Sequence, residues 1–172
     1  MDPLSVIASV IAVLQAANAV ISICYDFKAA MKDVPKTLTW IITEIQELRS
    51  VLETMDQLAS RDSNTDPGLS LKQWRSFEIV SEPQTGPLAA CLRELKSLET
   101  LIGGQSGDKK GSKTKALLQV MKWQFGGEEI RLSLQRIERI KSTLSLAITA
   151  DEARVDEKRY YDNNSEYANQ RT

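Results

Sequence analysis

Apolar residues recur along this chain at spacings of three and four, which is the period of an α-helix. The clearest case lies between residues 34 and 55, where spacings of four and three alternate and polar residues fill the opposite face. The apolar positions there are Val34, Leu38, Ile41, Ile45, Leu48, Leu52 and Met55. Such a stripe needs partner helices to cover it, so the pattern predicts a helix within a bundle.

Other segments repeat the helical period. We expect helices at 87–102, closed by Gly103-Gly104, at 113–125, and from Glu128 onward. Residues 60–86 contain turn-forming Pro and Gly residues, with a short helix expected near 71–79. No useful length shows the two-residue alternation of a strand. The predicted fold is an all-α bundle of four or five helices, packed near-antiparallel.

The N-terminal segment differs from the other helices because it is apolar nearly all round. Asp2 is a suitable N-cap and Pro3 suits the first helical position. From Pro3 to Tyr25 there is no charged residue over 23 positions. As a helix this run would measure ~35 Å, enough to cross the ~30 Å hydrocarbon core of a bilayer. The sequence predicts an apolar helix over 3–32.

Several interpretations of this helix compete. A secretory signal peptide is disfavoured, since the start lacks a basic region and the apolar run is too long. A permanent membrane anchor fits poorly with Gln15 and Asn18 in the run and with no cations flanking its N-terminal side. The central helix of a bundle, surrounded by neighbours, explains the resting fold.

Small residues at four-residue spacing in this helix allow close approach of another helix, in lipid or in a bundle. We therefore expect the helix to be packed in the soluble state and released to self-assemble in a bilayer. The residues predicted to insert are Leu4, Ile7, Ala8, Ile11, Ala12, Leu14, Ala16 and Val20.

Composition argues against catalysis. The chain has no histidine, and the two cysteines, Cys24 and Cys91, lie far apart in apolar runs. No Gly-rich phosphate loop is present. We expect no enzyme, no cofactor and no metal site, and two buried free thiols in a reducing cytoplasm. The formal net charge of −1 does not favour binding of nucleic acid.

Local basic patches remain candidates for binding anions. Lys109, Lys110, Lys113 and Lys115 place four cations within seven residues, suited to anionic lipid headgroups. A second set, Arg131, Arg136, Arg139 and Lys141, is interleaved with glutamates. An ordinary solvated surface is the alternative for both sets.

The C-terminal segment, 151–172, is polar and lacks an apolar stripe. We expect it to be a fraying helix end that leads into a linker or tail. The bundle itself is predicted to span residues 1–150.

The opening residues, MDPLSVIASVIAVLQ, resemble the N-terminus of the HeLo-like domains of fungal STAND and NLR-type proteins. The similarity continues through the apolar helix, the Val34-Pro35 junction and the 45–58 segment with Glu47-Leu48-Arg49. These domains are similar to the HeLo domain of HET-S and to the four-helix bundle of the mixed-lineage kinase-like executioner of necroptosis. In architecture the resemblance covers residues 1–150, and in recognisable sequence it covers the first sixty or so.

The resemblance implies an effector of programmed cell death, as in heterokaryon incompatibility and fungal innate immunity. Such a domain is cytoplasmic, oligomerises when triggered, and permeabilises the plasma membrane through its N-terminal helix. The implied partners are anionic membrane lipids, further copies of the chain and an NLR-type protein. The alternative is a signalling or oligomerisation adaptor of an NLR-like receptor that never enters lipid.

Overall fold

The computed structural model describes residues 3–64, 75–103 and 127–169, and the regular structure in these residues is helical. The helices are α1 (Pro3–Ala30), α2 (Lys36–Asn64), α3 (Arg75–Val80), α4 (Pro87–Gly103) and α6 (Glu128–Asn169). The expected all-α bundle is confirmed. The helix predicted at 113–125 lies outside the described residues.

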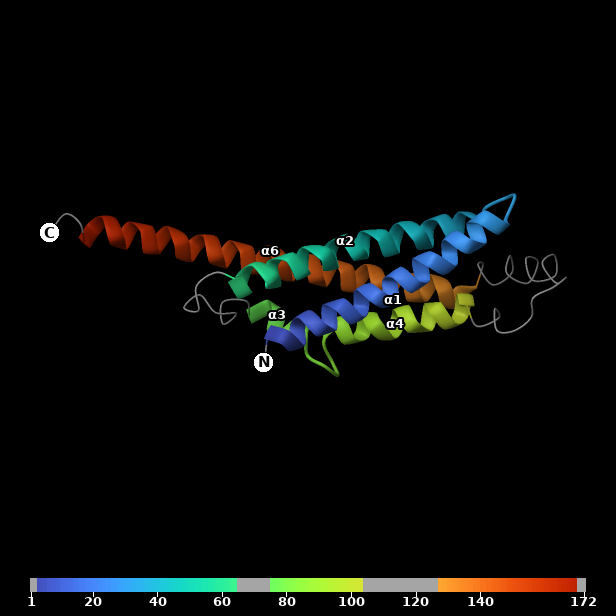
Figure 1. Cartoon of the computed structure of the whole chain (residues 1–172), viewed down its shortest axis with the longest axis horizontal. Coiled ribbons are helices and arrows are strands. Elements are labelled where there is room, and N and C mark those ends of the chain that lie inside the picture. The colour runs from blue at the N-terminus through green and yellow to red at the C-terminus, as the bar shows by residue number, and fades with distance from the viewer. Residues whose placement is uncertain (1–2, 65–74, 104–126, 170–172) are drawn as a thin grey trace.

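Four long helices form the bundle, in the spatial order α1, α2, α6, α4 around its axis (Figure 1). α1 packs against α2 and α4, α6 packs against the same two helices from the other side, and the short α3 lies on α6. Figure 1 shows that α1 and α2 run in opposite directions, as do α4 and α6. The fold therefore consists of two antiparallel helix pairs laid side by side.

Proline residues mark helix boundaries at positions 35 and 87. α1 ends at Ala30, slightly before the predicted residue 32, and Val34 is disfavoured in a helix because Pro35 follows it. The carbonyl of Pro35 then accepts the N–H of Leu38 at 3.0 Å and begins α2. At α4, Pro87 is the first helical residue, where its missing N–H costs nothing.

The core matches the apolar stripes read from the sequence. From Leu38 to Met55, the six stripe positions on α2 are fully buried. α4 and α6 contribute the stripe residues Leu88, Cys91, Leu95, Leu98 and Ile102, and Ile130, Leu134, Ile137, Leu144 and Ile148. These three helices therefore meet along large, branched apolar side chains, which supply most of the apolar area that folding buries.

The polar C-terminal segment continues α6 as far as Asn169. No Gly or Pro follows Gly127, so nothing in the sequence interrupts the helix. In Figure 1 this end of α6 extends beyond the other helices. α2 likewise runs on to Asn64, past the expected break at residue 60, because the first helix-breaking residue is Pro67.

Candidate functional site

The candidate site is α1. The side chains on its two sides differ in size and polarity, and neither side carries a charge between residues 3 and 25. One face is buried at residues spaced alternately by four and three, and we call it the docking face. It consists of Val6, Val10, Val13, Ala17, Val20 and Cys24. These residues lie in the groove that α2 and α4 provide.

The opposite side of α1, which we call the outer face, is exposed. It consists of Ala8, Ile11, Gln15, Asn18, Ser22 and Tyr25. Ile11 is 42% exposed and Tyr25 is 45% exposed. The outer face carries no charge, so it differs from the exposed faces of α2, α4 and α6, each of which carries charged residues.

The interpretation of α1 as a central helix enclosed by neighbours is wrong. It has two neighbours along its length, α2 and α4, whereas α6 lies across the bundle. A helix at one corner of a four-helix bundle keeps one side in water. The outer face of α1 is therefore uncharged even though it faces water and no other helix covers it.

The residues predicted to insert into a membrane do not lie on a single face. Ala16 and Val20 are buried, whereas Ala8 and Ile11 are exposed. Ile7, Ala12 and Leu14 are half-buried, and Leu4 lies in α1 with its side chain outside the described residues. Insertion would thus require α1 to leave the bundle, since part of its apolar surface faces the core.

The sequence reading missed the docking face, although the spacing of Val6, Val10 and Val13 is the same alternation that identified α2. The docking face does not stand out in the sequence because the residues between these valines are also apolar. Side-chain size marks this face, because valine, alanine and cysteine occupy it throughout.

The buried core positions of α1 carry small side chains, whereas its larger Leu14, Ile21, Ile23 and Phe27 are half-buried against the core. The largest fully buried side chains of the described residues come from α2, α4 and α6, and none comes from α1. Each methylene missing from a buried side chain removes about 0.8 kcal/mol of transfer free energy. Each side chain of the docking face therefore contributes less transfer free energy than a buried leucine or isoleucine of α2, α4 or α6.

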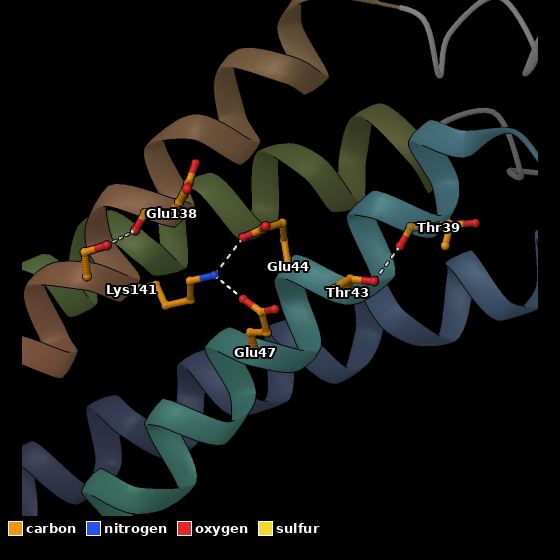
Figure 2. A network of polar contacts seen from close by, with 7 residues as sticks. Thr39, Thr43, Glu44, Glu47, Glu138 and Lys141 are labelled. Atoms are coloured by element: carbon orange, nitrogen blue, oxygen red, sulfur yellow. Dashed lines mark hydrogen bonds and ion pairs between the residues drawn. The ribbon is translucent and has the colours of Figure 1, made fainter.

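Charged side chains connect α6 to α2. The Lys141 ammonium on α6 donates to Glu44 at 2.9 Å and also to Glu47, both on α2 (Figure 2). The Lys141 and Glu44 side chains are 16% and 14% exposed, so the pair is largely shielded from water. Burial opposes the charge of Lys141, but the hydrogen bonds and charges of Glu47 and Glu44 outweigh it and raise the pKa of Lys141.

A second polar group connects α6 to α4. Glu94 on α4 accepts hydrogen bonds from the Ser133 hydroxyl at 3.0 Å and from Arg136 at 3.1 Å. Residues 3–25 hold no charge and can form no such ion pair. Near the end of α1, the Tyr25 hydroxyl accepts a hydrogen bond from the Gln46 amide at 3.1 Å. Electrostatic contacts therefore hold α2, α4 and α6 together and leave residues 3–25 without an ion pair.

The two thiols are free and buried, as expected. Burial raises the pKa of the Cys24 thiol to about 12. Burial, followed by the charge of Glu94, raises the pKa of Cys91 to about 12. Neither thiol is a nucleophile at neutral pH, because the thiolate is the reactive form. Cys24 serves as a small apolar residue of the docking face.

α1 is long and apolar enough, by length and composition, to cross a bilayer over Val6–Ala30. Within its most apolar stretch, 39% is buried in the bundle. A core helix of a soluble protein meets the same criterion. The length and apolar composition of α1 therefore fit either role.

The basic candidates divide into two groups. The lysines at 109, 110, 113 and 115 lie outside the described residues. On α6, Arg131 pairs with Glu128, Arg136 with Glu94, and Lys141 with Glu44 and Glu47. Most of this second set is therefore neutralised within the bundle. In the described ranges, no group of three or more His, Cys, Asp or Glu residues is placed to hold a metal ion.

Comparison of the chain with protein-family models, with curated proteins and with solved structures finds no match.

Proposed function

We propose that this chain is a membrane-permeabilising helical bundle, acting as a cell-death effector. In the resting cytoplasmic state α1 occupies the groove between α2 and α4. On activation α1 leaves the groove and inserts into the plasma membrane, where copies of the chain assemble and form a pore.

The observation that carries this proposal is the contrast between α1 and the rest of the bundle. α1 is uncharged over 3–25 and docks through small side chains, whereas α2, α4 and α6 meet along large side chains and ion pairs. An uncharged helix that docks through small side chains and is long enough to cross hydrocarbon is suited to transfer between the two.

Recruitment to an anionic leaflet would come from the lysines at 109, 110, 113 and 115, each contributing about 1 kcal/mol near such a surface. Screening by salt weakens attraction of this kind. The partners of the active state are thus anionic lipids and further copies of the chain. An attached NLR-type protein would supply the trigger.

The test is dye release from vesicles of phosphatidylcholine and phosphatidylserine, with Asn18→Asp as the probe. Asn18 is exposed, so this near-isosteric change leaves the docking face intact. It places a charge at the middle of the span Val6–Ala30, where an aspartate costs about 3 kcal/mol on insertion scales. We expect dye release to fall about a hundredfold.

Gln57→Glu is the matched control, because it adds one negative charge at an exposed amide on α2. It should release dye as the wild type does. Equal release by Asn18→Asp and wild type, with both folded by circular dichroism, would contradict insertion of α1. No release by the wild type at any concentration would contradict the proposed function itself.

The extension of α6 past the bundle favours a second candidate, a signalling adaptor that never enters lipid (Figure 1). A protruding helix suits the connection to another domain or partner. Flotation with the same vesicles separates the two functions. An adaptor stays at the bottom of the gradient while it still forms concentration-dependent oligomers, whereas a membrane effector floats with the lipid.

A further inference from the structure

Three polar side chains within the uncharged part of α1 lie on its outer face. Gln15, Asn18 and Ser22 follow one another at spacings of three and four and are exposed. The structure shows no hydrogen bond from these three side chains to the described residues. In the resting protein they meet water, which satisfies their donors and acceptors.

The same three side chains have no water partner once α1 lies in hydrocarbon. Asn18 falls at the middle of the span Val6–Ala30, and Gln15 lies one turn away. An amide at that depth must find another polar group, because lipid chains offer none. Polar side chains in membrane helices accordingly form hydrogen bonds between helices.

The docking face has the opposite preference. Its valines, alanine and cysteine are apolar and need no hydrogen-bond partner. They are covered by α2 and α4 in the bundle and are equally compatible with acyl chains. α1 therefore has one face that requires a partner in lipid and one that does not.

We propose that α1 exchanges the roles of its faces in the membrane. The docking face turns to lipid, and the stripe of Gln15, Asn18 and Ser22 binds the same stripe on the α1 of a second copy. This inference rests on the proposed membrane insertion and specifies the interface through which inserted copies assemble.

The α1 helix of a second copy is the binding partner that the chain itself provides. Among the described residues, α1 is the one helix apolar enough to span a bilayer. α2, α4 and α6 carry charged residues along their lengths. Copies inserted in the same direction place identical residues at the same depth, so Asn18 meets Asn18 and Gln15 meets Gln15.

The experiment compares wild type with the double variant Gln15→Leu/Asn18→Leu on vesicles of phosphatidylcholine and phosphatidylserine. Both sites are exposed, so the variant keeps its docking face and becomes more compatible with lipid. We expect flotation to show at least as much bound protein as for wild type. Chemical cross-linking of the bound fraction should show about tenfold less oligomer, and dye release should fall in proportion.

Two matched variants control for side-chain character. Gln57→Leu makes one such glutamine-to-leucine change at an exposed site on α2 and should behave as wild type. Asn18→Gln keeps an amide in the stripe and should retain cross-linking and dye release.

The outcomes separate the two proposals. Undiminished cross-linking and release by the double variant, at equal binding, would overturn the stripe as the interface and leave insertion standing. Loss of release in Asn18→Asp through lost binding, together with loss in the double variant through lost assembly, supports both. A wild type that neither floats nor releases dye overturns both.

Discussion

Lys141 shows how one side chain connects two helices of this bundle. Its ammonium lies between Glu44 and Glu47 and is mostly shielded from solvent (Figure 2). Because the pKa of Lys141 is raised in the folded state, its contribution to stability is complete below the unfolded-state pKa near 10.5. The contribution is lost as the pH rises through the higher folded-state pKa.

We expect Lys141→Met to lower the free energy of unfolding by about 1–3 kcal/mol at pH 7, because Glu44 loses its partner at a poorly hydrated position. Urea unfolding measures the difference, which should persist up to pH 10 and shrink above it. Arg49→Met is the control, since both members of the Arg49–Glu53 pair are 46% exposed. That change should cost less than about 0.5 kcal/mol. Equal costs would mean that the Lys141 contacts add nothing beyond an exposed pair.

Gly86 is required by close backbone approach in the turn between α3 and α4. A Cβ at this position would lie 2.6 Å from the Glu82 carbonyl oxygen and 2.8 Å from that of Val80. Both contacts are with backbone oxygens, which cannot move away without distorting the turn. We expect Gly86→Ala to destabilise the protein by about 1–3 kcal/mol in thermal or urea unfolding. Thr85→Ala, at the exposed neighbouring residue, should change stability by less than about 0.5 kcal/mol.

Asp151 is an acidic residue whose burial the sequence did not reveal. It opens the segment expected to be a fraying end, yet it is fully buried. Its Oδ1 accepts the Ser76 N–H of α3 at 3.4 Å and an Arg154 N–H at 3.1 Å, while Oδ2 has no hydrogen-bond partner among the described residues. The contact joins residues 75 apart in sequence. Local pattern cannot report it, because it depends on where α3 lies.

At the scale of the element, α1 docks through a buried face of small side chains. Ala17 is fully buried in the groove between α2 and α4. A leucine there would overpack the interface, whereas Ala8→Leu on the outer face of the same helix adds the same atoms in solvent. We expect Ala17→Leu to weaken docking by about 1–3 kcal/mol.

Two measurements compare Ala17→Leu with Ala8→Leu and with the wild type. Urea unfolding should show Ala17→Leu less stable than Ala8→Leu. If α1 must leave the bundle to act, Ala17→Leu should also release vesicle dye faster than wild type. A destabilised Ala17→Leu protein that releases dye no faster would indicate that undocking of α1 does not limit activity.

The helices differ in how fully the sequence revealed them. On α2, large apolar residues alternate with charged ones, so one pattern gave both the helix and its buried face. On α1, both faces lack charge between residues 3 and 25, so the sequence revealed the helix but not its orientation. Which side of α1 faces the core is decided by the fit of small side chains against α2 and α4, a property of the assembled bundle.

At the scale of the whole molecule, stability is unevenly distributed. α2, α4 and α6 share large buried side chains, and ion pairs join α6 to the other two. α1 shares neither feature along residues 3–25. Proteins open locally in units whose free energies follow such differences in packing. We therefore expect α1 to open as a unit while the other three helices stay folded.

Native-state hydrogen exchange tests this expectation directly. Amides of residues 7–24 should exchange through an opening that costs at least ~1.5 kcal/mol less than the opening of α2 residues 41–55, which is about tenfold in population. Ala17→Leu should widen that gap, because it weakens docking of α1 without touching contacts among α2, α4 and α6. If α1 amides exchange only through global unfolding, at the free energy of α2, the helix is an integral part of the core. Release of α1 would then require unfolding of the whole bundle, and the mechanism proposed for membrane entry would fail.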